Sequence, residues 1–322
     1  MSSPSPSASS ILVSQILTYS CRFAGPILLF IGTIGCSLNL TVFCQKTLRR
    51  SPCANYFIAY NIANILYIYC GLLFLTISLG YQIDRTTSSL VLCRLHLYTA
   101  LLFHSLSQFY LILASVDRVL ITSHHALTRR RSTHHLARIS IIIGTIFLII
   151  FHSHALIFPN IIQIIPHVFI CNFEQSWEGA FINYYTIFKE TLLLSLMIIL
   201  GLKSIHNIRN IQHSRVAPEE STRATIVDRN IHSTSSKDRQ LVLILIGDIT
   251  MYALFSFIFA IYLIYMQITI NVVKTSDRTQ IENNLRNVCL FLLNIPCCIS
   301  FYLNFIISKS FRSEVKKIFA QN

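Results

Sequence analysis

The stretch CRLHLYTALLFHSLSQFYLILASVDRVLITSHHALTRRR, from Cys93 to Arg131, decides the fold of this chain. It is almost wholly apolar, or small and uncharged, up to the acid-arginine pair Asp117-Arg118. A helix over residues 90–122 would be about 50 Å long at ~1.5 Å per residue, which exceeds the ~30 Å hydrocarbon core of a bilayer. The stretch therefore predicts a tilted membrane-spanning helix with the pair near the inner interface. Charges at that depth are costly unless they are paired or used, so we weigh a functional site against a plain interfacial ion pair.

Composition indicates a membrane protein. Of the 322 residues, 53% are hydrophobic and only 12% are charged, whereas soluble domains carry about 25% charged residues. The formal net charge of +13 could suggest nucleic acid as a partner. The basic residues, however, alternate along the chain with apolar spans, as the positive-inside rule describes. We therefore expect the lipid bilayer as a partner and no nucleic acid.

The chain contains seven apolar spans, at about residues 23–45, 55–79, 90–122, 137–158, 180–202, 241–267 and 285–308. The loops after the odd-numbered spans hold most of the Lys and Arg, which predicts a multi-pass protein with its N-terminus outside. Residues 1–22 would then be a short extracellular tail, and residues 309–322 a cytoplasmic amphipathic helix and tail. The expected fold class is all-α, with residues 23–308 forming a seven-transmembrane-helix bundle and a short interfacial helix following it.

The inner end of the third span points to a family. Asp117-Arg118-Val119 follows Cys93, with the arginine twenty-five residues after the cysteine. This arrangement, inside the third of seven spans, resembles the rhodopsin-like (class A) G-protein-coupled receptors, which have Asp-Arg-Tyr in that place. The resemblance covers about residues 23–319. It implies a plasma-membrane receptor in which an extracellular ligand moves the helices and opens an inner cleft around Arg118 for a heterotrimeric G protein.

The resemblance also implies partners for residues at both ends of the bundle. Cys93 would form a disulfide with Cys171, the only cysteine between spans four and five. Both lie outside in this topology, where disulfides persist, and two free thiols are the alternative. Asp238, at the start of span six, matches an acid that often reaches across to the arginine of span three. Alternatively, Asp238 balances Lys237 and Arg239 in solvent.

Other family landmarks are altered, which indicates a divergent member. Asn39 resembles the conserved asparagine of helix one in the family. Asn64 stands where the family has its sodium-binding aspartate, so we expect no sodium site, because the charge that would hold the cation is missing. Ser300 and Asn304 occupy the two ends of the usual Asn-Pro-x-x-Tyr motif in span seven. Pro296 is a candidate kink in that span.

Positions that could face a ligand follow from helical spacing along span three. Ala100, His104 and Gln108 lie on one stripe at i and i+4. Ala100 takes the place of the aspartate of the family's amine receptors, so a biogenic amine has no counter-ion there. Lys189 and Glu190 in span five do not face each other on a helix, so each should find another partner, either a charged ligand group or His104 and Gln108.

No cofactor and no metal are expected. Span seven lacks the lysine that a retinal Schiff base requires. The ten cysteines of the chain form no metal-ligand pattern.

A ligand-binding receptor is favoured over two other classes of protein. A transporter tends to show repeats and broken spans near the middle of the membrane, and no repeat is visible. An enzyme would carry a motif such as HExxH or GxSxG, and neither is present, so we expect no enzyme. The KDRQL segment before span six, SFYL in span seven and the SKSFR tail look most like invertebrate neuropeptide-type receptors. They favour a peptide ligand, with a small polar or lipid-derived ligand as the alternative.

Overall fold

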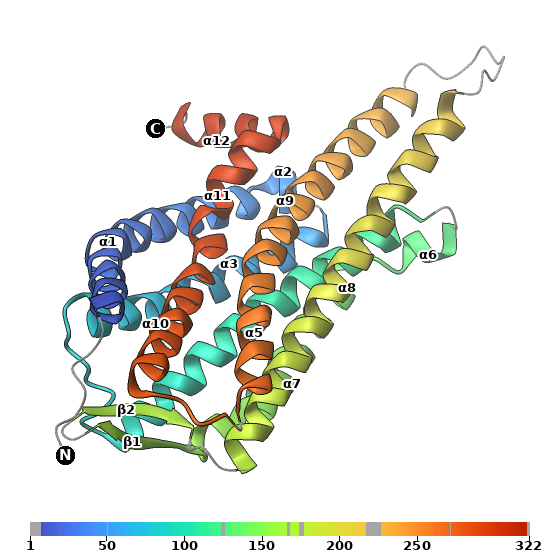
Figure 1. Cartoon of the computed structure of the whole chain (residues 1–322). Helices are drawn as coiled ribbons and strands as arrows, with labels where there is room; N and C mark the ends of the chain where they lie inside the picture. Colours follow the sequence, from blue (N-terminus) through green and yellow to red (C-terminus); the bar gives the residue numbers. More distant parts are fainter. Residues whose placement is uncertain are drawn as a thin grey trace, which may run out of the picture.

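The computed structural model describes residues 8–49, 51–123, 126–165, 168–173, 177–216, 227–270 and 272–320. In this part of the chain, seven helical segments are long and apolar enough to cross a membrane. They form one bundle, with a two-stranded hairpin at one end and a short helix lying across the other end (Figure 1). The seven-transmembrane-helix bundle expected from the sequence, followed by a short C-terminal helix, is therefore confirmed.

The elements have the following bounds. The first four spans and their connections contain α1 (Ala8–Cys44), α2 (Lys46–Arg49), α3 (Cys53–Tyr67), η1 (Ile68–Leu72), α4 (Leu73–Leu75), η2 (Thr76–Gly80), α5 (Leu90–Ile121), α6 (Ala126–Arg130), α7 (His134–Phe151) and η3 (His152–Leu156). The rest contains β1 (Pro159–Ile165), β2 (Val168–Phe173), α8 (Trp177–Val216), α9 (Val227–Ile268), α10 (Ser276–Leu292), α11 (Ile295–Ile307) and α12 (Lys309–Ala320).

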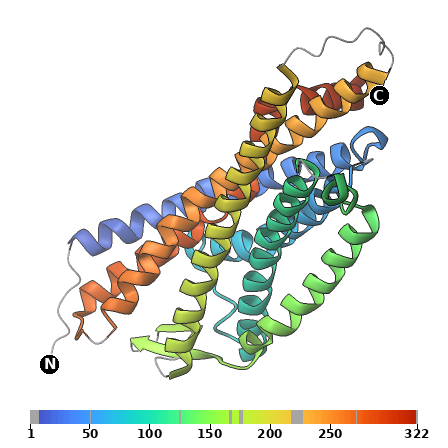
Figure 2. The ribbon, with the colours of Figure 1, turned by 90° about the vertical axis from the view of Figure 1, so that its right-hand side faces the viewer.

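The third span, α5, lies at the centre of the bundle. It packs against α3, α7, α8 and α9 (Figure 2). In its most apolar stretch 61% of the residues are buried, against 22–44% in the other six spans. A charged or polar side chain on α5 is therefore more often buried against other helices than one on the other six spans. Because of this difference, the buried polar contacts of the molecule centre on α5.

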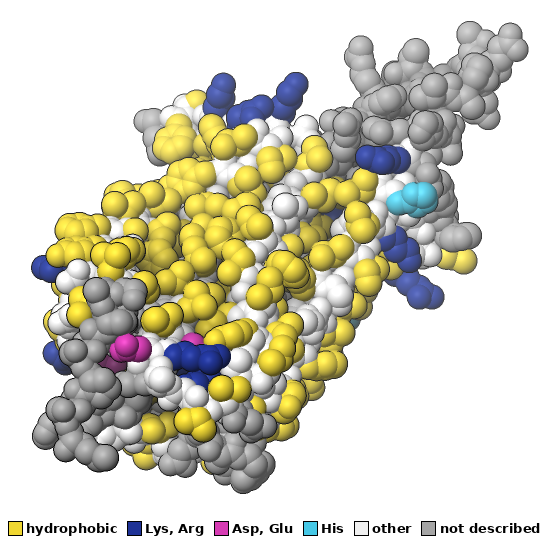
Figure 3. All heavy atoms as spheres, viewed as in Figure 1, with side chains coloured by type: hydrophobic (Ala, Val, Ile, Leu, Met, Phe, Trp, Pro, Cys, Tyr) yellow, Lys and Arg dark blue, Asp and Glu magenta, His cyan; other side chains and the backbone are white. Residues whose placement is uncertain are grey.

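The outer surface of the bundle is apolar. Hydrophobic side chains cover most of the face seen in Figure 3, and Lys and Arg side chains lie mainly toward its ends. On α7, Ile142, Phe147 and Ile150 are 57%, 59% and 66% exposed. Large apolar patches of this kind mark a surface that is covered, here by lipid hydrocarbon. The chain is thus a multi-pass membrane protein.

The first helix begins earlier than the sequence analysis placed it. Residues 8–22 were expected in an extracellular tail, but α1 starts at Ala8 and continues without a break to Cys44. Leu12, Ile16 and Tyr19 provide the reason, because apolar residues at i, i+4 and i+7 continue an exposed apolar stripe along the helix. The helix therefore extends well beyond the expected start of the span.

Span seven is interrupted. Helix α10 ends at Leu292 and α11 begins at Ile295, with Pro296 in the first turn of α11. Proline has no N–H to donate and is tolerated in a first turn, where that donor would be unpaired anyway. The interruption separates the outer half of the span from the inner half, which carries Ser300 and Asn304.

Close approach of α7 to α5 depends on a glycine. Gly144 is buried on the face of α7 that meets α5, and a Cβ atom built there would overlap the ring of Phe109. With the Phe109 ring in this position, the two helices can therefore pack at this distance because residue 144 has no side chain.

Candidate functional site

The hairpin covers the end of the site that the sequence analysis places outside, called the outer end below. Strands β1 and β2 pair antiparallel, with Ile161 opposite Cys171. Cys171 forms a disulfide with Cys93 in the first turn of α5, with the two Cα atoms 5.6 Å apart. Arg94 adds a hydrogen bond from its Nε to the carbonyl oxygen of Pro159, at 3.1 Å. The predicted disulfide is thus confirmed, and it fixes both strands over the outer end of α5.

The inner end of α5 carries a buried ion pair. Arg118 is 0% exposed, and its Nη2 lies 2.8 Å from Oδ2 of Asp117. The same nitrogen donates to Oγ of Ser51, which precedes α3, at 2.9 Å. Ser132 donates to the other oxygen of Asp117 at 2.5 Å. The pair is therefore held between the segments before α3 and before α7, as a buried charge requires.

Of the two further residues predicted at the inner end, the structure describes the side chain of only one. Val119 is half-buried on α5. Asp238 lies in the helical residues of α9, but its side chain is outside the described part of the chain. The contact between Asp238 and Arg118 therefore stays a prediction.

A glutamine at the inner end of α9 was missed by sequence reasoning. The Oε1 atom of Gln240 accepts a hydrogen bond from Oγ of Ser308 at 3.0 Å and another from the backbone N–H of Ser310. Ser308 lies in the bend between α11 and α12, and Ser310 lies in the first turn of α12. Ser308 also caps α12, because its Oγ accepts from the backbone N–H of Phe311 at 3.2 Å. Gln240 thus joins span six to span seven at the inner end.

Four of the five predicted ligand-facing residues meet in one cluster between α5 and α8. The carboxylate of Glu190 accepts from Nε2 of Gln108 at 2.9 Å and lies 3.7 Å from Nδ1 of His104. Lys189 places its Nζ 2.9 Å from Glu190 and donates to Ser105 at 3.1 Å. The exposed fractions of these side chains are small, 5% for His104, 1% for Gln108, 8% for Lys189 and 2% for Glu190.

The expectation that each of Lys189 and Glu190 finds another partner is confirmed, since Glu190 contacts Gln108 and His104 and Lys189 contacts Ser105. The two residues also contact each other, which was not expected. The long, flexible lysine stem allows this, because its ammonium group can curve back to the carboxylate of the next residue. Ala100, the fifth predicted residue, is half-buried one turn away and takes no part in the described polar contacts.

The cluster continues toward the fourth span. His152 in η3 lies with its Nε2 3.1 Å from Oγ of Ser105 and 3.0 Å from the hydroxyl of Tyr185. His152 is 0% exposed. The polar side chains of α5, η3 and α8 therefore contact one another, as is favoured for buried polar groups in a membrane protein. Two buried atoms of the cluster, Nε2 of His104 and Oε1 of Gln108, have no hydrogen-bond partner among the described residues.

A second group of polar contacts joins span one to span two, and span two to spans three and six. Asn39 donates to Asn61 at 2.9 Å. Asn64 accepts from Oγ of Ser107 at 2.5 Å, and Ser107 lies 2.6 Å from the hydroxyl of Tyr252 on α9. Asn64, in the place of the family's aspartate, thus contacts side chains of α5 and α9 and carries no charge.

A buried carboxylate on α9 was also missed by the sequence analysis. Asp248 is 2% exposed and accepts a hydrogen bond from Oγ of Ser300 at 2.8 Å. Asn304 in turn donates to Ser300 at 3.4 Å. The rule that ionisable residues within apolar spans mark function could have found Asp248, because it interrupts the apolar run of span six.

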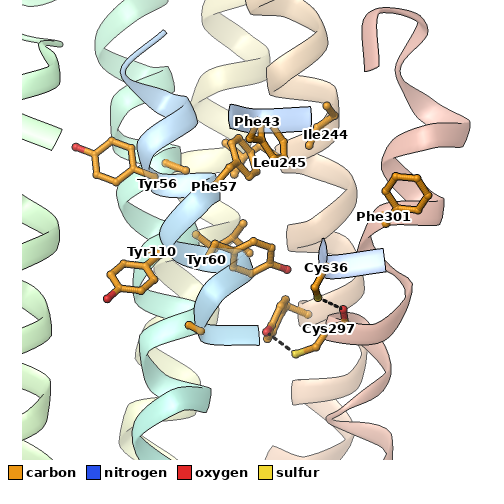
Figure 4. Close-up of a cluster of buried hydrophobic side chains, with 14 of the residues drawn as sticks. Cys36, Phe43, Tyr56, Phe57, Tyr60, Tyr110, Ile244, Leu245, Cys297 and Phe301 are labelled. Atoms are coloured by element: carbon orange, nitrogen blue, oxygen red, sulfur yellow. Dashed lines mark hydrogen bonds between the residues drawn. The ribbon is translucent and has the colours of Figure 1, made fainter. Parts of the chain in front are cut away.

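Aromatic and sulfur-containing side chains surround this network. Figure 4 shows Tyr60 on α3 together with Cys36 and Cys297, and the Sγ of Cys36 donates to the carbonyl oxygen of Cys297 at 3.5 Å. The hydroxyl of Tyr252 lies 3.1 Å from the sulfur of Cys297. Cys297 in span seven therefore contacts residues of spans one and six.

Comparison with known proteins agrees with this architecture. Residues 36–300 match the model of the family described as 7 transmembrane receptor (rhodopsin family). The crystal structure of squid rhodopsin superposes with a TM-score of 0.73 at 13% sequence identity, covering 95% of this chain and 86% of that chain. No curated protein sequence matches. The structural likeness shows the fold, whereas the family match covers most of the chain: the protein belongs to the rhodopsin family of seven-transmembrane receptors, the class A G-protein-coupled receptors.

Proposed function

We propose that this protein is a plasma-membrane receptor, with its N-terminus outside, that activates a heterotrimeric G protein through Arg118. The proposal rests on the burial and the contacts of the Arg118 side chain. Its guanidinium is fully buried at the inner end of the central helix, paired with Asp117 and hydrogen-bonded to Ser51. A buried charge that can be released by helix movement is suited to receive a partner, because exposing it restores its hydration.

The proposed movement separates the inner end of α9 from the rest of the bundle. Two described contacts would have to break, the hydrogen bonds that Gln240 accepts from Ser308 and Ser310. The network that includes Asp248 and Ser300 lies deeper on the same two helices and supplies a pivot. Ligand binding outside would shift the balance between the closed and open arrangements by its differential affinity for them.

We propose a peptide as the extracellular ligand. The resemblance to invertebrate neuropeptide-type receptors supports this choice, and so does the hairpin over the outer end of α5. Because the cluster around Glu190 is buried and its described members contact one another, a ligand would engage above it. Strands β1 and β2 offer backbone groups at the edge of a two-stranded sheet to an extended chain there.

One experiment tests the coupling role of Arg118. A peptide library is screened on cells that express this chain, and an active peptide is then applied to the Arg118→Ala variant at matched surface expression. We expect G-protein activation to be lost, because the residue that receives the partner is gone. Arg129→Ala is the matched control, since Arg129 is exposed on α6 and its loss should leave most of the response. Normal activation by Arg118→Ala at normal surface expression would contradict the proposal.

A further inference from the structure

A hollow of about 350 Å³ lies between the first turns of α1 and the residues that follow the second span. Eight residues line it: Ser14, Gln15, Thr18, Tyr19, Arg22, Gly80, Tyr81 and Gln82. Small-molecule sites in proteins enclose roughly 300–1,000 Å³, so this hollow has room for one small group. None of the residues described above as part of the bundle interior lines it.

The polar wall of the hollow follows from the sequence of α1. Ser14, Thr18 and Arg22 are spaced at i, i+4 and i+8 and therefore share one face of the helix. Leu12 and Ile16, each 57% exposed, lie on another face of the same turns. The outer end of α1 is thus amphipathic, with its polar face toward the hollow.

The floor of the hollow is set by a close helix crossing. A Cβ atom at Gly80 would lie 2.8 Å from the backbone nitrogen of Arg22, so only glycine allows the two segments to touch there. Just beyond, the backbone turns away at Gln82, which has a φ of 56°. Contact at Gly80 followed by separation at Gln82 leaves the hollow between α1 and the chain that leaves the second span.

Among the eight described lining residues, Arg22 is the only one that carries a charge. Its guanidinium carbon lies 5.6 Å from the centre of the Tyr81 ring, which positions the cation at the hollow. Within the described part of the chain, no acidic side chain forms an ion pair with Arg22. The hydroxyl and amide groups of Ser14, Gln15 and Thr18 add hydrogen-bond donors to the same wall.

The depth of Arg22 along α1 places the hollow at the outer membrane surface. Arg22 precedes Cys44, the last residue of α1, by 22 residues, which is about 33 Å at ~1.5 Å per residue. That length matches the ~30 Å hydrocarbon core. In the proposed topology, Arg22 therefore reaches the level of the outer headgroups, where both lipid phosphates and soluble extracellular acids are present.

We propose that this hollow binds an oxyanion, namely a phosphate, sulfate or carboxylate group, with Arg22 as its counter-ion. A guanidinium with adjacent donors suits such a group, because its fixed N–H fork can form two parallel charge-assisted hydrogen bonds. The oxyanion belongs either to an outer-leaflet lipid headgroup or to a soluble extracellular ligand. The proposal uses the outside position of the N-terminus but no part of the G-protein mechanism, so either proposal can fail without the other.

The test uses the full chain purified in maltoside micelles, whose detergent carries no phosphate. Thermal unfolding is measured while sodium chloride is replaced by sodium phosphate or sulfate at constant ionic strength. At ten times the dissociation constant, binding should raise the unfolding midpoint by roughly 2–4 °C. Arg22→Gln should abolish this rise. Arg85→Gln should keep it, because Arg85 is an exposed arginine just after the hollow and does not line it.

The same assay identifies the source of the oxyanion. Phosphatidylglycerol added to the micelles should raise the midpoint in an Arg22-dependent way and remove the further effect of phosphate if the group comes from lipid. If the oxyanion belongs to an extracellular ligand, a soluble dicarboxylic acid should raise the midpoint in an Arg22-dependent way and remove the further effect of phosphate, and phosphatidylglycerol should do neither. No rise with any of these probes, or an equal rise in Arg22→Gln and Arg85→Gln, would overturn the proposal.

Discussion

At the scale of single residues, the clearest requirement is that buried charges stay paired. Replacing Glu190 by Ala leaves the ammonium group of Lys189 buried between α5 and α8 without its carboxylate. Breaking a buried pair in this way costs about 3–5 kcal/mol of folding free energy. We expect Glu190→Ala to unfold at a clearly lower temperature than the wild-type chain in detergent. The double variant Lys189→Met, Glu190→Leu should recover much of the loss, and a double variant less stable than the single one would refute this account of the cluster.

The same scale shows what sequence reasoning can and cannot find. Arg118 and the Cys93–Cys171 disulfide were identified because each belongs to a motif with fixed spacing. The partners of Gln240 were missed because Ser308 and Ser310 lie 68 and 70 residues further along the chain. A hydrogen bond over such a separation depends on how whole helices pack, and no local pattern encodes it.

At the scale of elements, the inner contact between α9 and the bend before α12 should restrain signalling. In Gln240→Ala both accepted hydrogen bonds are lost, at about 1 kcal/mol each. If α9 moves away on activation, the closed state loses these bonds and the open state does not. Ligand-independent signalling should therefore rise about 5- to 30-fold. Thr250→Ala is the control, because Thr250 is exposed on α9 and its hydroxyl bonds only within the helix. Equal basal signalling in both variants would exclude the restraint.

A second restraint at the same end concerns Asp238. If its carboxylate reaches Arg118, Asp238→Ala should also raise ligand-independent signalling. The effect should be several-fold at most, since a partly exposed pair is worth about 1 kcal/mol or less. The measurement is basal G-protein activation at matched surface expression. Unchanged basal signalling would refute the contact between Asp238 and Arg118 but not the coupling role of Arg118.

Elements differ in how strongly the sequence signals them. The transmembrane spans are visible because long apolar runs have few alternative structures. The hairpin β1–β2 was not predicted, because its strands are only seven and six residues long and mostly apolar, so that they resemble the end of a span. The start of α1 was placed too late because polar residues break the apolar run at its beginning. Ser14, Thr18 and Arg22 interrupt the apolar run, although they occupy a single face of a continuous helix.

At the scale of the whole molecule, orientation in the membrane is the property on which most other proposals depend. The distribution of Lys and Arg places the N-terminus outside. An epitope tag inserted before Ile11 should therefore be labelled by antibody on intact cells. A tag after the last residue serves as the control and should be labelled only in permeabilised cells. The reverse pattern would refute the topology, and the proposed receptor function with it.

The contact between Gly144 and Phe109 has a consequence for natural variation in this protein. On α7, the lipid-exposed positions Ile142, Ile143 and Ile146 need only remain apolar, so exchanges among Ile, Leu, Val and Phe there should persist in populations. Position 144 has no such freedom, because even a methyl group would meet the ring of Phe109. An inherited change at that codon would require either a shift of the Phe109 ring or a smaller residue at position 109. The two codons, which lie in different spans, should therefore be inherited as a compatible pair.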